Sequence, residues 1–540
     1  MLARTRLYRC TRTPSHFYTG VSFSTSSPAS FLRRKGSNSN KTSNKTPNEP
    51  EDRWNYNRSA LFDPSEAPDP ASLRLVTAND LESGSKPPRG VKMLARDYIE
   101  DALYNPNYGY FSKRATIFDW SQQPLDFSKI RNNVEFDVVV AERYAAYEAD
   151  KQLWHTPTEL FKPWYGEAIA RCLVAEYLLK YFPYEDFVIY EIGAGNGTLA
   201  QNILDFLRAE HPEVYDRTRY TIIEISGNLA KKQKLRLQKS HPSVQVVHKS
   251  IFHWAVREPA PCFFLAMEVI DNFAHDVVRY DLDTLEPYQG IVTVDDKGDF
   301  DMIYTKVNDP LISSFLKLRE RLKHSLPINP LFQKFPTARK LYRNMPFAAN
   351  LSKEEYIPTR LLSLIQTLRN HFPRHRLLLS DFAFLPDTIP GVNAPVVQTR
   401  IQNTTVPCQT LTVHQGVFDI FFPTNFEHLR DMYEFILSQP RTVPLSSPDY
   451  DPSLPDRSTP LTSNALSLSL GSDFFSSHIP SRRSPLDGVS SASGLPVGER
   501  KSSVFTHAEF LETYADLNKT RLRNGENPML DFYKNVKFLF

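Results

Sequence analysis

Short apolar runs alternate with amphipathic stretches through the middle of the chain. The apolar runs have the length of buried strands, and the stretches between them repeat apolar residues at helical spacing. We predict helices at 92–104, 163–180, 198–207, 229–239 and 358–372, strands at 187–190, 220–225, 244–247, 262–267 and 376–380, and a hairpin at 290–307. Strands separated by helices of this length build a parallel sheet covered on both faces. The predicted fold is a Rossmann-like, doubly wound α/β domain with an inserted hairpin and helices and an N-terminal helical extension.

The N-terminal part of the chain differs from this core in composition. Residues 1–48 contain no Asp or Glu, nine Lys or Arg and nine Ser. A basic, Ser-rich and acid-free leader is typical of a mitochondrial transit peptide, although a basic tail has the same composition. Residues 49–90 are polar and contain Pro, which predicts a linker before the folded domain at 91–439.

The C-terminal part contains a second change of composition. Of the 65 residues at 440–504, 26 are Pro or Ser, a mixture that buries too little apolar area to offset its ordering entropy. We therefore predict a disordered insertion there. A capping box formed by Thr506 and Glu509 indicates a helix, and we expect the segment 505–540 to dock back on the core.

Charge and cysteine content exclude several classes of protein. The 540 residues carry a formal charge of +3, which becomes −6 once the nine basic residues of 1–48 are removed. A mildly acidic protein is a poor candidate for binding nucleic acid. No apolar run approaches the roughly 18 residues of a membrane span, so we expect no stable membrane insertion. The four cysteines are scattered, which predicts neither a zinc site nor disulfides and favours a reducing compartment.

A glycine-rich loop follows the first predicted strand of the core. It reads Glu191-Ile-Gly193-Ala-Gly195-Asn-Gly197-Thr198 and leads into a predicted helix. Glycines at this point let backbone N–H groups approach a bound nucleotide. Glu224 ends the next strand, where Rossmann-type folds place an acid that accepts hydrogen bonds from ribose hydroxyls.

The same loop favours S-adenosylmethionine over a dinucleotide as the ligand. A dinucleotide fingerprint has its third glycine five positions after the first, where this chain has Thr198. Glu191 at the strand end would repel a pyrophosphate but attract the ammonium and sulfonium charges of S-adenosylmethionine. We therefore predict a donor site made of Glu191, the three glycines, Thr198 and Glu224.

Two acids follow the strand predicted at 262–267, whose carboxyl end should face the methyl group. Glu268 and Asp271 are spaced i, i+3, which places them on one side of a turn. An arginine guanidinium is planar, stays charged and pairs with carboxylates in bidentate fashion, so it suits them as methyl acceptor. His275 is a less favoured candidate for accepting the proton.

Several of these segments, in this order, resemble the mitochondrial protein arginine methyltransferases that support assembly of respiratory complex I, with their MidA-like bacterial relatives. The resemblance lies in the turn 105–110, Thr156-Pro-Thr-Glu159 before Gly166-Glu167, the loop 191–198, Glu224-Ile-Ser226, Glu268 with Asp271, Asp381-Phe382, and Gly416 to Asp419 with Phe426. The sequence differs from the family pattern at Thr158, Ala274 and Ala383.

The resemblance implies a class I methyltransferase fold and S-adenosylmethionine as methyl donor. It also implies symmetric dimethylation of an arginine on a core subunit of complex I in the mitochondrial matrix. Two alternatives stay open, namely a catalytically silent assembly factor that binds S-adenosylmethionine and a mitochondrial methyltransferase for small molecules. The sequence leaves the target arginine and the oligomeric state undetermined.

Overall fold

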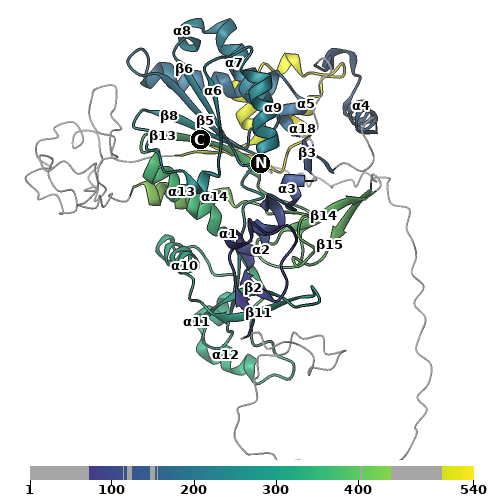
Figure 1. Ribbon diagram of the computed structural model, residues 1–540, viewed down its shortest axis with the longest axis vertical. Helices are drawn as coiled ribbons and strands as arrows, with labels where there is room; N and C mark the ends of the chain where they lie inside the picture. Colours follow the sequence, from purple (N-terminus) through teal and green to yellow (C-terminus); the bar gives the residue numbers. More distant parts are fainter. Residues whose placement is uncertain are drawn as a thin grey trace, which may run out of the picture. The chain divides into compact units, whose positions relative to one another are not determined.

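The computed structural model describes residues 72–113, 115–117, 124–145, 152–154, 156–401, 404–438 and 502–540 (Figure 1). Two compact units separate by their internal contacts, Met1–Glu66 and Ala67–Phe540, and every described residue belongs to the second. The predicted transit peptide, the first part of the predicted linker and nearly all of the predicted insertion at 440–504 lie outside the described residues.

A seven-stranded sheet forms the centre of the second unit (Figure 1). Its spatial order is β7 (Val244–His248), β6 (Thr218–Glu224), β5 (Phe187–Ile192), β8 (Cys262–Met267), β13 (His375–Phe382), β18 (Val536–Leu539) and β17 (Val504–Thr506). The first five strands are parallel, and β18 runs antiparallel to both β13 and β17. In chain order these strands stand 3-2-1-4-5-7-6, so the direction of winding reverses between β5 and β8.

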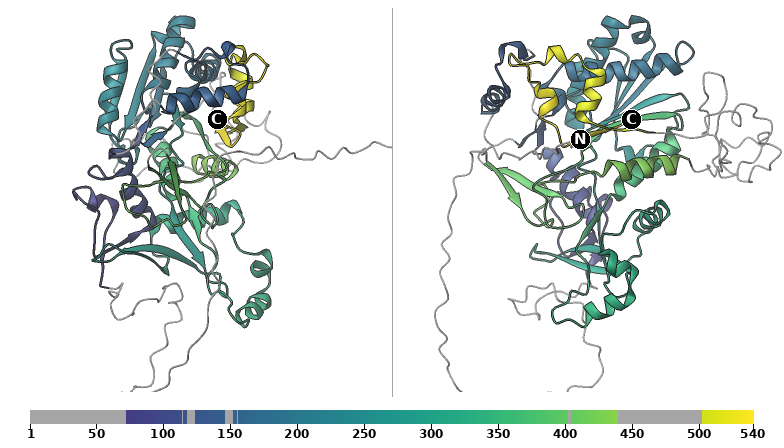
Figure 2. Two further views of the ribbon diagram at one scale, coloured as in Figure 1. Left: turned by 90° about the vertical axis from the view of Figure 1, so that its right-hand side faces the viewer. Right: turned by 180° about the vertical axis from the view of Figure 1, so that it is seen from behind.

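Apolar side chains cover both faces of this sheet, as the uninterrupted apolar runs of β5 and β8 predict. Phe187 and Ile189 point to one core and Val188 and Tyr190 to the other. The first core includes α6 (Trp164–Lys180), α7 (Thr198–Glu210), α8 (Pro212–Tyr215), α9 (Gly227–Leu237) and α17 (His507–Tyr514). The second includes α10 (Pro310–Leu322), α13 (Thr359–His371) and α14 (Phe426–Leu437), and Figure 2 shows both layers from two further sides.

A second, mostly antiparallel sheet is built from two distant parts of the chain. Its order is β1 (Arg74–Leu75), β2 (Val91–Leu94), β10 (Pro287–Val294), β9 (Asp276–Tyr280) and β12 (Glu355–Ile357), with β11 (Phe300–Lys306) also paired to β10. The predicted hairpin is the β10–β11 pair, closed by a turn in which Gly298 N–H bonds to Asp295 O. A small third sheet contains β14 (Val396–Ile401), β15 (Thr404–Cys408) and β16 (Asp419–Phe421).

The N-terminal extension differs from the prediction in two respects. Residues 91–94 form β2 and only Ala95–Tyr104 form the helix α2, because Val91 and Met93 alternate with less buried residues and pair with β10. The predicted linker also ends earlier than residue 90. Residues 72–90 belong to the described part of the chain, and Val76 and Leu81 of the segment around α1 (Ala78–Leu81) are buried in a third apolar core.

Shorter elements complete the described residues. They are α3 (Tyr110–Lys113), β3 (Ala115–Ile117), η2 (Phe127–Lys129), α4 (Asn133–Ala145), β4 (Gln152–Trp154), α5 (Pro157–Leu160), η3 (Ile251–His253), α11 (Pro330–Lys334), α12 (Pro336–Arg343), η4 (Leu517–Lys519) and α18 (Pro528–Asp531). Within the described ranges, no helix is long and apolar enough to cross a membrane.

Candidate functional site

The glycine loop connects β5 to α7 in left-handed backbone conformations. Gly193, Gly195 and Gly197 have φ values of 65°, 55° and 77°. A Cβ atom on Gly193 would lie 2.7 Å from Val269 Cγ2, closer than side chains tolerate. The left-handed backbone and the short distance to Val269 therefore both require glycine at position 193. Without a side chain at this position, the loop packs closely against the segment that follows β8.

Glu159, on α5, forms hydrogen bonds with the last residues of this loop. Its Oε1 accepts hydrogen bonds from Thr198 Oγ1 at 2.5 Å and from Asn196 Nδ2 at 3.2 Å. Its Oε2 lies 3.0 Å from Lys162 Nζ. The Thr198 hydroxyl is thus engaged within the protein. Sequence reasoning gave Glu159 no role, although the motif Thr156–Glu159 marks it.

Glu191 lies at the end of β5 on the side of the sheet covered by α6 and α7. Its Oε2 accepts a hydrogen bond of 2.8 Å from Tyr220 Oη. Burial raises the pKa of Glu191 to about 7, while the Tyr220 hydrogen bond acts in the opposite direction. A nearby cation would favour the charged form of Glu191. In the structure, this carboxylate is hydrogen-bonded to the Tyr220 hydroxyl.

Glu224 lies at the end of β6, and its carboxylate is held from two sides. Oε1 accepts from Ser226 N at 2.9 Å, and Oε2 accepts from Gln233 Nε2 at 2.8 Å. The same Gln233 nitrogen donates to Gly195 O at 2.8 Å, which links this acid to the glycine loop. The backbone N–H of Ile225 also interacts with this carboxylate, which leaves Glu224 able to accept a ribose hydroxyl.

A cavity of about 220 Å³ lies at the carboxyl ends of β5 and β6, next to the segment after β8. This is the switch point at which open α/β sheets bind ligands. The end of α2 and the following turn cover it from the other side, through Tyr104, Asn105 and Pro106. The rest of its wall includes Ile192, Gly193, Ile223, Glu224, Ile225, Ile251, Phe252, Val269 and Arg360.

The lining of this cavity fits the nucleoside part of S-adenosylmethionine. Ile225, Ile251 and Phe252 supply an apolar wall, and Glu224 supplies a carboxylate of the kind that accepts ribose hydroxyls. Of the predicted donor residues, Gly193 and Glu224 line the cavity. Gly195, Gly197 and Thr198 shape the loop behind it, and Glu191 contacts Tyr220.

Glu268 directly follows β8, and its surroundings are unusual for a carboxylate. Its backbone is left-handed, with φ of 54°, and its N–H bonds to Ser380 O. The side chain is partly exposed, and among the described residues no hydrogen-bond donor contacts its carboxylate. Burial, followed by the charge of Asp381, raises the pKa of Glu268 well above its usual value.

Three buried acids lie around the turn that follows Glu268: Asp381 and Asp271 interact with Glu268, and Asp419 interacts with Asp271. Asp381 Oδ2 accepts backbone hydrogen bonds from residues 269, 270 and 271 at 2.9–3.1 Å, which holds the turn after β8. Asp419 Oδ1 accepts from Asn272 Nδ2 at 3.0 Å. Burial raises the pKa of Asp381 and of Asp419 to about 7 each. For Asp271, burial and then the charges of Asp381, Asp419 and Glu268 raise the pKa well above its usual value.

Tyr104 connects the donor cavity with these four acids, which we call the acid cluster (Glu268, Asp271, Asp381, Asp419). It lines the cavity, and its hydroxyl donates to Asn272 O at 3.2 Å. Burial, and then the charges of Asp271 and Asp419, raise its pKa well above 10, so the hydroxyl keeps its proton. Tyr104 is a site residue that sequence reasoning did not single out.

His275 belongs to the apolar core. Burial lowers its pKa to about 3, and its ring stacks on Phe422 with 3.8 Å between ring centroids. Its Nδ1 lies 2.8 Å from Phe273 O. A buried imidazole in this position stays neutral and is stacked on Phe422, which speaks against a role as catalytic base.

The turn 105–110 and the segment around Gly416 meet beside the cavity, although about 300 residues separate them. A Cβ atom on Gly416 would lie 1.8 Å from Tyr108 O, and Gly416 has φ of 77°. Its N–H bonds to Ala102 O. This contact places Asp419 next to α2. The turn 105–110 and the segment 416–419 therefore both border the same site.

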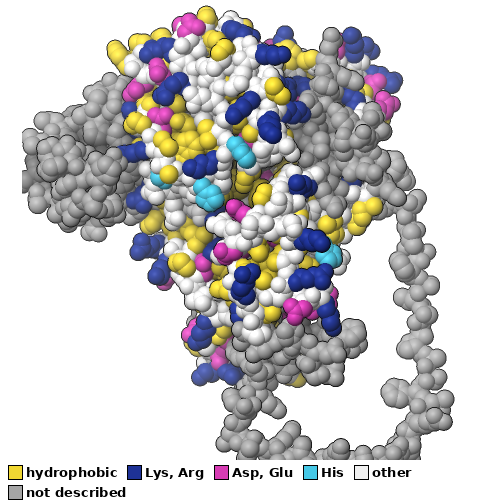
Figure 3. All heavy atoms as spheres, viewed as in Figure 1, with side chains coloured by type: hydrophobic (Ala, Val, Ile, Leu, Met, Phe, Trp, Pro, Cys, Tyr) yellow, Lys and Arg dark blue, Asp and Glu magenta, His cyan; other side chains and the backbone are white. Residues whose placement is uncertain are grey.

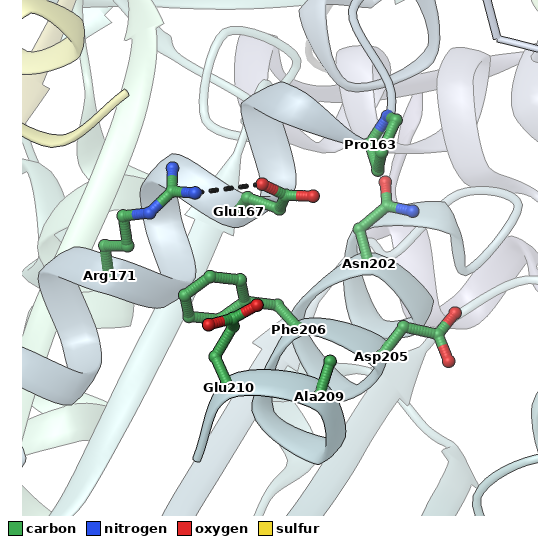
Figure 4. Close-up of a pocket in the computed structure, with 8 residues that line it drawn as sticks. All are labelled: Pro163, Glu167, Arg171, Asn202, Asp205, Phe206, Ala209 and Glu210. Atoms are coloured by element: carbon green, nitrogen blue, oxygen red, sulfur yellow. Dashed lines mark hydrogen bonds and ion pairs between the residues drawn. The ribbon is translucent and has the colours of Figure 1, made fainter. Parts of the chain in front are cut away.

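A second cavity, of about 290 Å³, lies between α6 and α7 (Figure 4). Its wall consists of Pro163 and residues of these two helices, and Arg171 pairs with Glu167 at 3.0 Å along the α6 side. None of the predicted site residues lines it. Among the residues that the structure describes, no group of three or more His, Cys, Asp or Glu side chains is arranged to hold a metal ion.

Comparison with known proteins decides the family. Residues 168–441, just over half of the chain, match the family described as "Putative S-adenosyl-L-methionine-dependent methyltransferase". The chain belongs to this family. Its cofactor is therefore S-adenosylmethionine, and the doubly wound sheet is the class I methyltransferase fold.

Two curated relatives of this methyltransferase carry the same name, "Protein arginine methyltransferase NDUFAF7 homolog, mitochondrial". The one from Schizosaccharomyces pombe is 26% identical over 343 residues, which cover 57% of this chain and 67% of the relative. The one from Saccharomyces cerevisiae is 22% identical over 232 residues, 41% of this chain and 51% of the relative. Among solved structures, a Burkholderia thailandensis protein bound to S-adenosyl-homocysteine has 17% identity and a TM-score of 0.41, covering 67% of this chain and 75% of its own.

Proposed function

We propose that this methyltransferase acts on arginine side chains of a protein, and that Glu268 and Asp271 hold the guanidinium group. The observation that carries the proposal is the carboxylate of Glu268, which accepts no hydrogen bond from any described residue and lies close to Asp271 and Asp381 at the end of the strand beside the donor cavity. A cation that enters this place would stabilise the charged form of Glu268, to whose carboxylate no described residue donates a hydrogen bond.

The electrostatics favour a guanidinium over a neutral acceptor. The acid cluster is surrounded by protein, which disfavours the charged form of each member. A guanidinium stays charged at any physiological pH and presents parallel N–H donors to a carboxylate. Binding it would compensate the buried negative charge and leave one terminal nitrogen free for the methyl group.

The proposed donor residues are Glu191, Gly193, Gly195, Gly197, Thr198 and Glu224. Bound S-adenosylmethionine supplies an electrophilic methyl group. The chain contributes positioning: Glu224 accepts hydrogen bonds from the ribose, and the contact between Gly193 and Val269 sets the donor cavity against the acid cluster. Glu268 and Asp271 stabilise positive charge on the guanidinium while the methyl group is transferred.

We further propose that the protein works in the mitochondrial matrix and dimethylates an arginine of a complex I core subunit symmetrically. The acid-free residues 1–48 and the printed names of the relatives support the location. The resemblance in the acid pair, the turn 105–110 and the segment 416–419 supports the substrate class. A catalytically silent assembly factor and a small-molecule methyltransferase are the alternatives.

The test is a mass-spectrometric comparison of mitochondrial proteins from cells with and without this protein. The proposal predicts that symmetric dimethylarginine disappears from a complex I subunit when the protein is absent. Complementation with Glu268→Gln should fail to restore the modification, whereas Glu512→Gln, an exposed acid on α17, should restore it. An unchanged dimethylarginine profile would contradict the proposal, and rescue of complex I by Glu268→Gln would support the silent assembly factor.

A further inference from the structure

The segment that contains α11 and α12 combines exposed apolar side chains with positive charge. Five of its large apolar residues are at least half exposed, and Phe347 is exposed completely; they are Leu331, Phe335, Leu341, Met345 and Phe347. Among the described residues, the other exposed apolar side chains are spread over many elements. Phe347 also has a left-handed backbone, with φ of 64°, which is uncommon for a bulky residue.

The same stretch contains no acidic residue. From residue 321 to residue 353 there is no Asp or Glu, and seven residues are Lys or Arg. Figure 3 shows basic side chains at the end of the described unit where Figure 1 places α11 and α12. Lys334 and Lys340 are exposed and have no ion-pair partner among the described residues.

Two arginines of α12 connect this helix to neighbouring parts of the chain. Arg339 donates to Asp283 O at 2.8 Å and to Phe332 O at 2.6 Å, and Arg343 pairs with the Asp283 carboxylate. The rings of Phe332 and Tyr342 lie 5.1 Å apart between α11 and α12. These contacts use two of the arginines and neutralise the acid that touches the segment, so the lysines and apolar side chains are left on the outside.

We propose that this surface, made of Leu331, Lys334, Phe335, Lys340, Leu341, Met345 and Phe347, binds the headgroup region of an anionic lipid bilayer. Interfacial helices that lie on membranes pair an apolar side with lysines that reach phosphate groups. The charge selects an anionic surface, and it disfavours a basic protein segment such as one rich in arginine. The contact is peripheral, because the elements are short and no described helix can span a membrane.

The test uses the full 540-residue chain with Phe347→Trp and vesicles of phosphatidylcholine with and without phosphatidylglycerol. Brominated lipid quenches tryptophan only on close contact, so quenching beyond that of the parent chain, which has five Trp, reports on position 347. The proposal predicts this quenching with anionic vesicles and none with neutral ones. Binding through the basic residues 1–48 would not by itself bring residue 347 into contact with brominated lipid, so quenching at position 347 distinguishes the two modes of binding.

Two pairs of variants measure the contributions of charge and apolar area. Lys334→Glu with Lys340→Glu should weaken vesicle binding at least 25-fold, about fivefold for each positive charge removed. Leu341→Ser with Phe347→Ser should weaken it about tenfold or more. The matched controls Lys234→Glu with Lys239→Glu and Leu179→Ser with Leu235→Ser, equally exposed elsewhere, should bind like the parent.

The proposal is overturned if the parent and the α12 variants bind vesicles equally, which would assign binding to another part of the chain. It is also overturned if position 347 is not quenched. A third result would also contradict it: the parent binds no lipid but self-associates, and Leu341→Ser with Phe347→Ser abolishes this self-association. The surface would then be an interface between copies of the chain.

Discussion

The carboxylates in the two halves of the site differ in their hydrogen bonds to the protein. On the donor side, Glu159, Glu191 and Glu224 each accept hydrogen bonds from protein donors, so the loop and the ribose acceptor are already arranged. On the acceptor side, no described residue donates a hydrogen bond to the carboxylate of Glu268, and Asp271 accepts one from the N–H of its neighbour Asn272, whereas Asp381 and Asp419 behind them accept from protein donors. The difference supports the proposal that the protein arranges the donor half in advance, whereas a cationic ligand completes the pairing of Glu268 and Asp271.

Replacing Glu268 by Gln should have the largest effect. The substitution preserves shape and removes the charge that is proposed to stabilise the guanidinium. By comparison with other charge-stabilising groups, it should cost about 2–4 kcal/mol in the transition state, roughly 30- to 1000-fold in turnover. Donor affinity measured by calorimetry should hardly change. A normal rate in this variant and in Asp271→Asn would refute the assignment, and loss of donor binding would move these acids to the cofactor site.

Replacing Gly193 by Ala should affect the donor half. The new Cβ atom would lie 2.7 Å from Val269 Cγ2 in a left-handed backbone, a conformation that costs about 1–2 kcal/mol for a residue with a side chain. Calorimetry should show about tenfold weaker S-adenosylmethionine binding or more. Adding Val269→Ala removes the clash but not the backbone strain, so the double variant should recover part of the affinity. Unchanged affinity in Gly193→Ala would place the donor elsewhere.

The acid cluster should make the stability of the ligand-free protein depend on pH. The pKa of Asp419 is about 7 in the folded protein and near 4 when unfolded, so the folded state binds more protons between these values. The free energy of unfolding therefore falls as pH rises from about 4 to 7, at most ~1.4 kcal/mol per pH unit for one such group. Asp419→Asn should remove part of this slope in thermal melts from pH 5.5 to 7.5. An identical slope in the variant would show that Asp419 is charged in the folded protein.

Removing residues 441–500 should have the smallest effect. These residues lie outside the described structure, and the chain resumes at residue 502, where Ser502 N bonds to Glu434 Oε1 and β17 pairs with β18. The deletion should leave the melting temperature and donor affinity nearly unchanged, because the Pro- and Ser-rich composition of this segment supplies few core-forming residues. A large drop in melting temperature would show that it packs on the core.

Local patterns in the sequence were sufficient for the core of the fold. The six residues of β8 are all apolar and buried or nearly so, and the predicted strand has the same bounds as the observed one. The strand β2 was taken for helix because four alternating residues are too few to distinguish the two periods. Its partner β10 lies about 200 residues further along the chain, so no local signal reports the pairing.

The donor half of the site was likewise more accessible to prediction than the acceptor half. The glycine loop and Glu224 are recognised because strand, loop and helix are consecutive in the chain. The roles of Glu159 and Asp381 depend on contacts over 39 and 110–112 residues, and sequence spacing does not encode these contacts. Glu268 was predicted from its place after a strand, but only the three-dimensional structure shows that no described residue donates to its carboxylate.

The most direct test of the account is transfer of an isotopically heavy methyl group in vitro. Mitochondrial proteins from cells that lack this protein are incubated with labelled S-adenosylmethionine and either the parent chain or Glu268→Gln, and the products are read by mass spectrometry. The account predicts heavy methyl groups on arginine with the parent chain, and little or none with Glu268→Gln at the same donor affinity. Label in metabolites, label on residues other than arginine, or equal arginine labelling by both chains would contradict it.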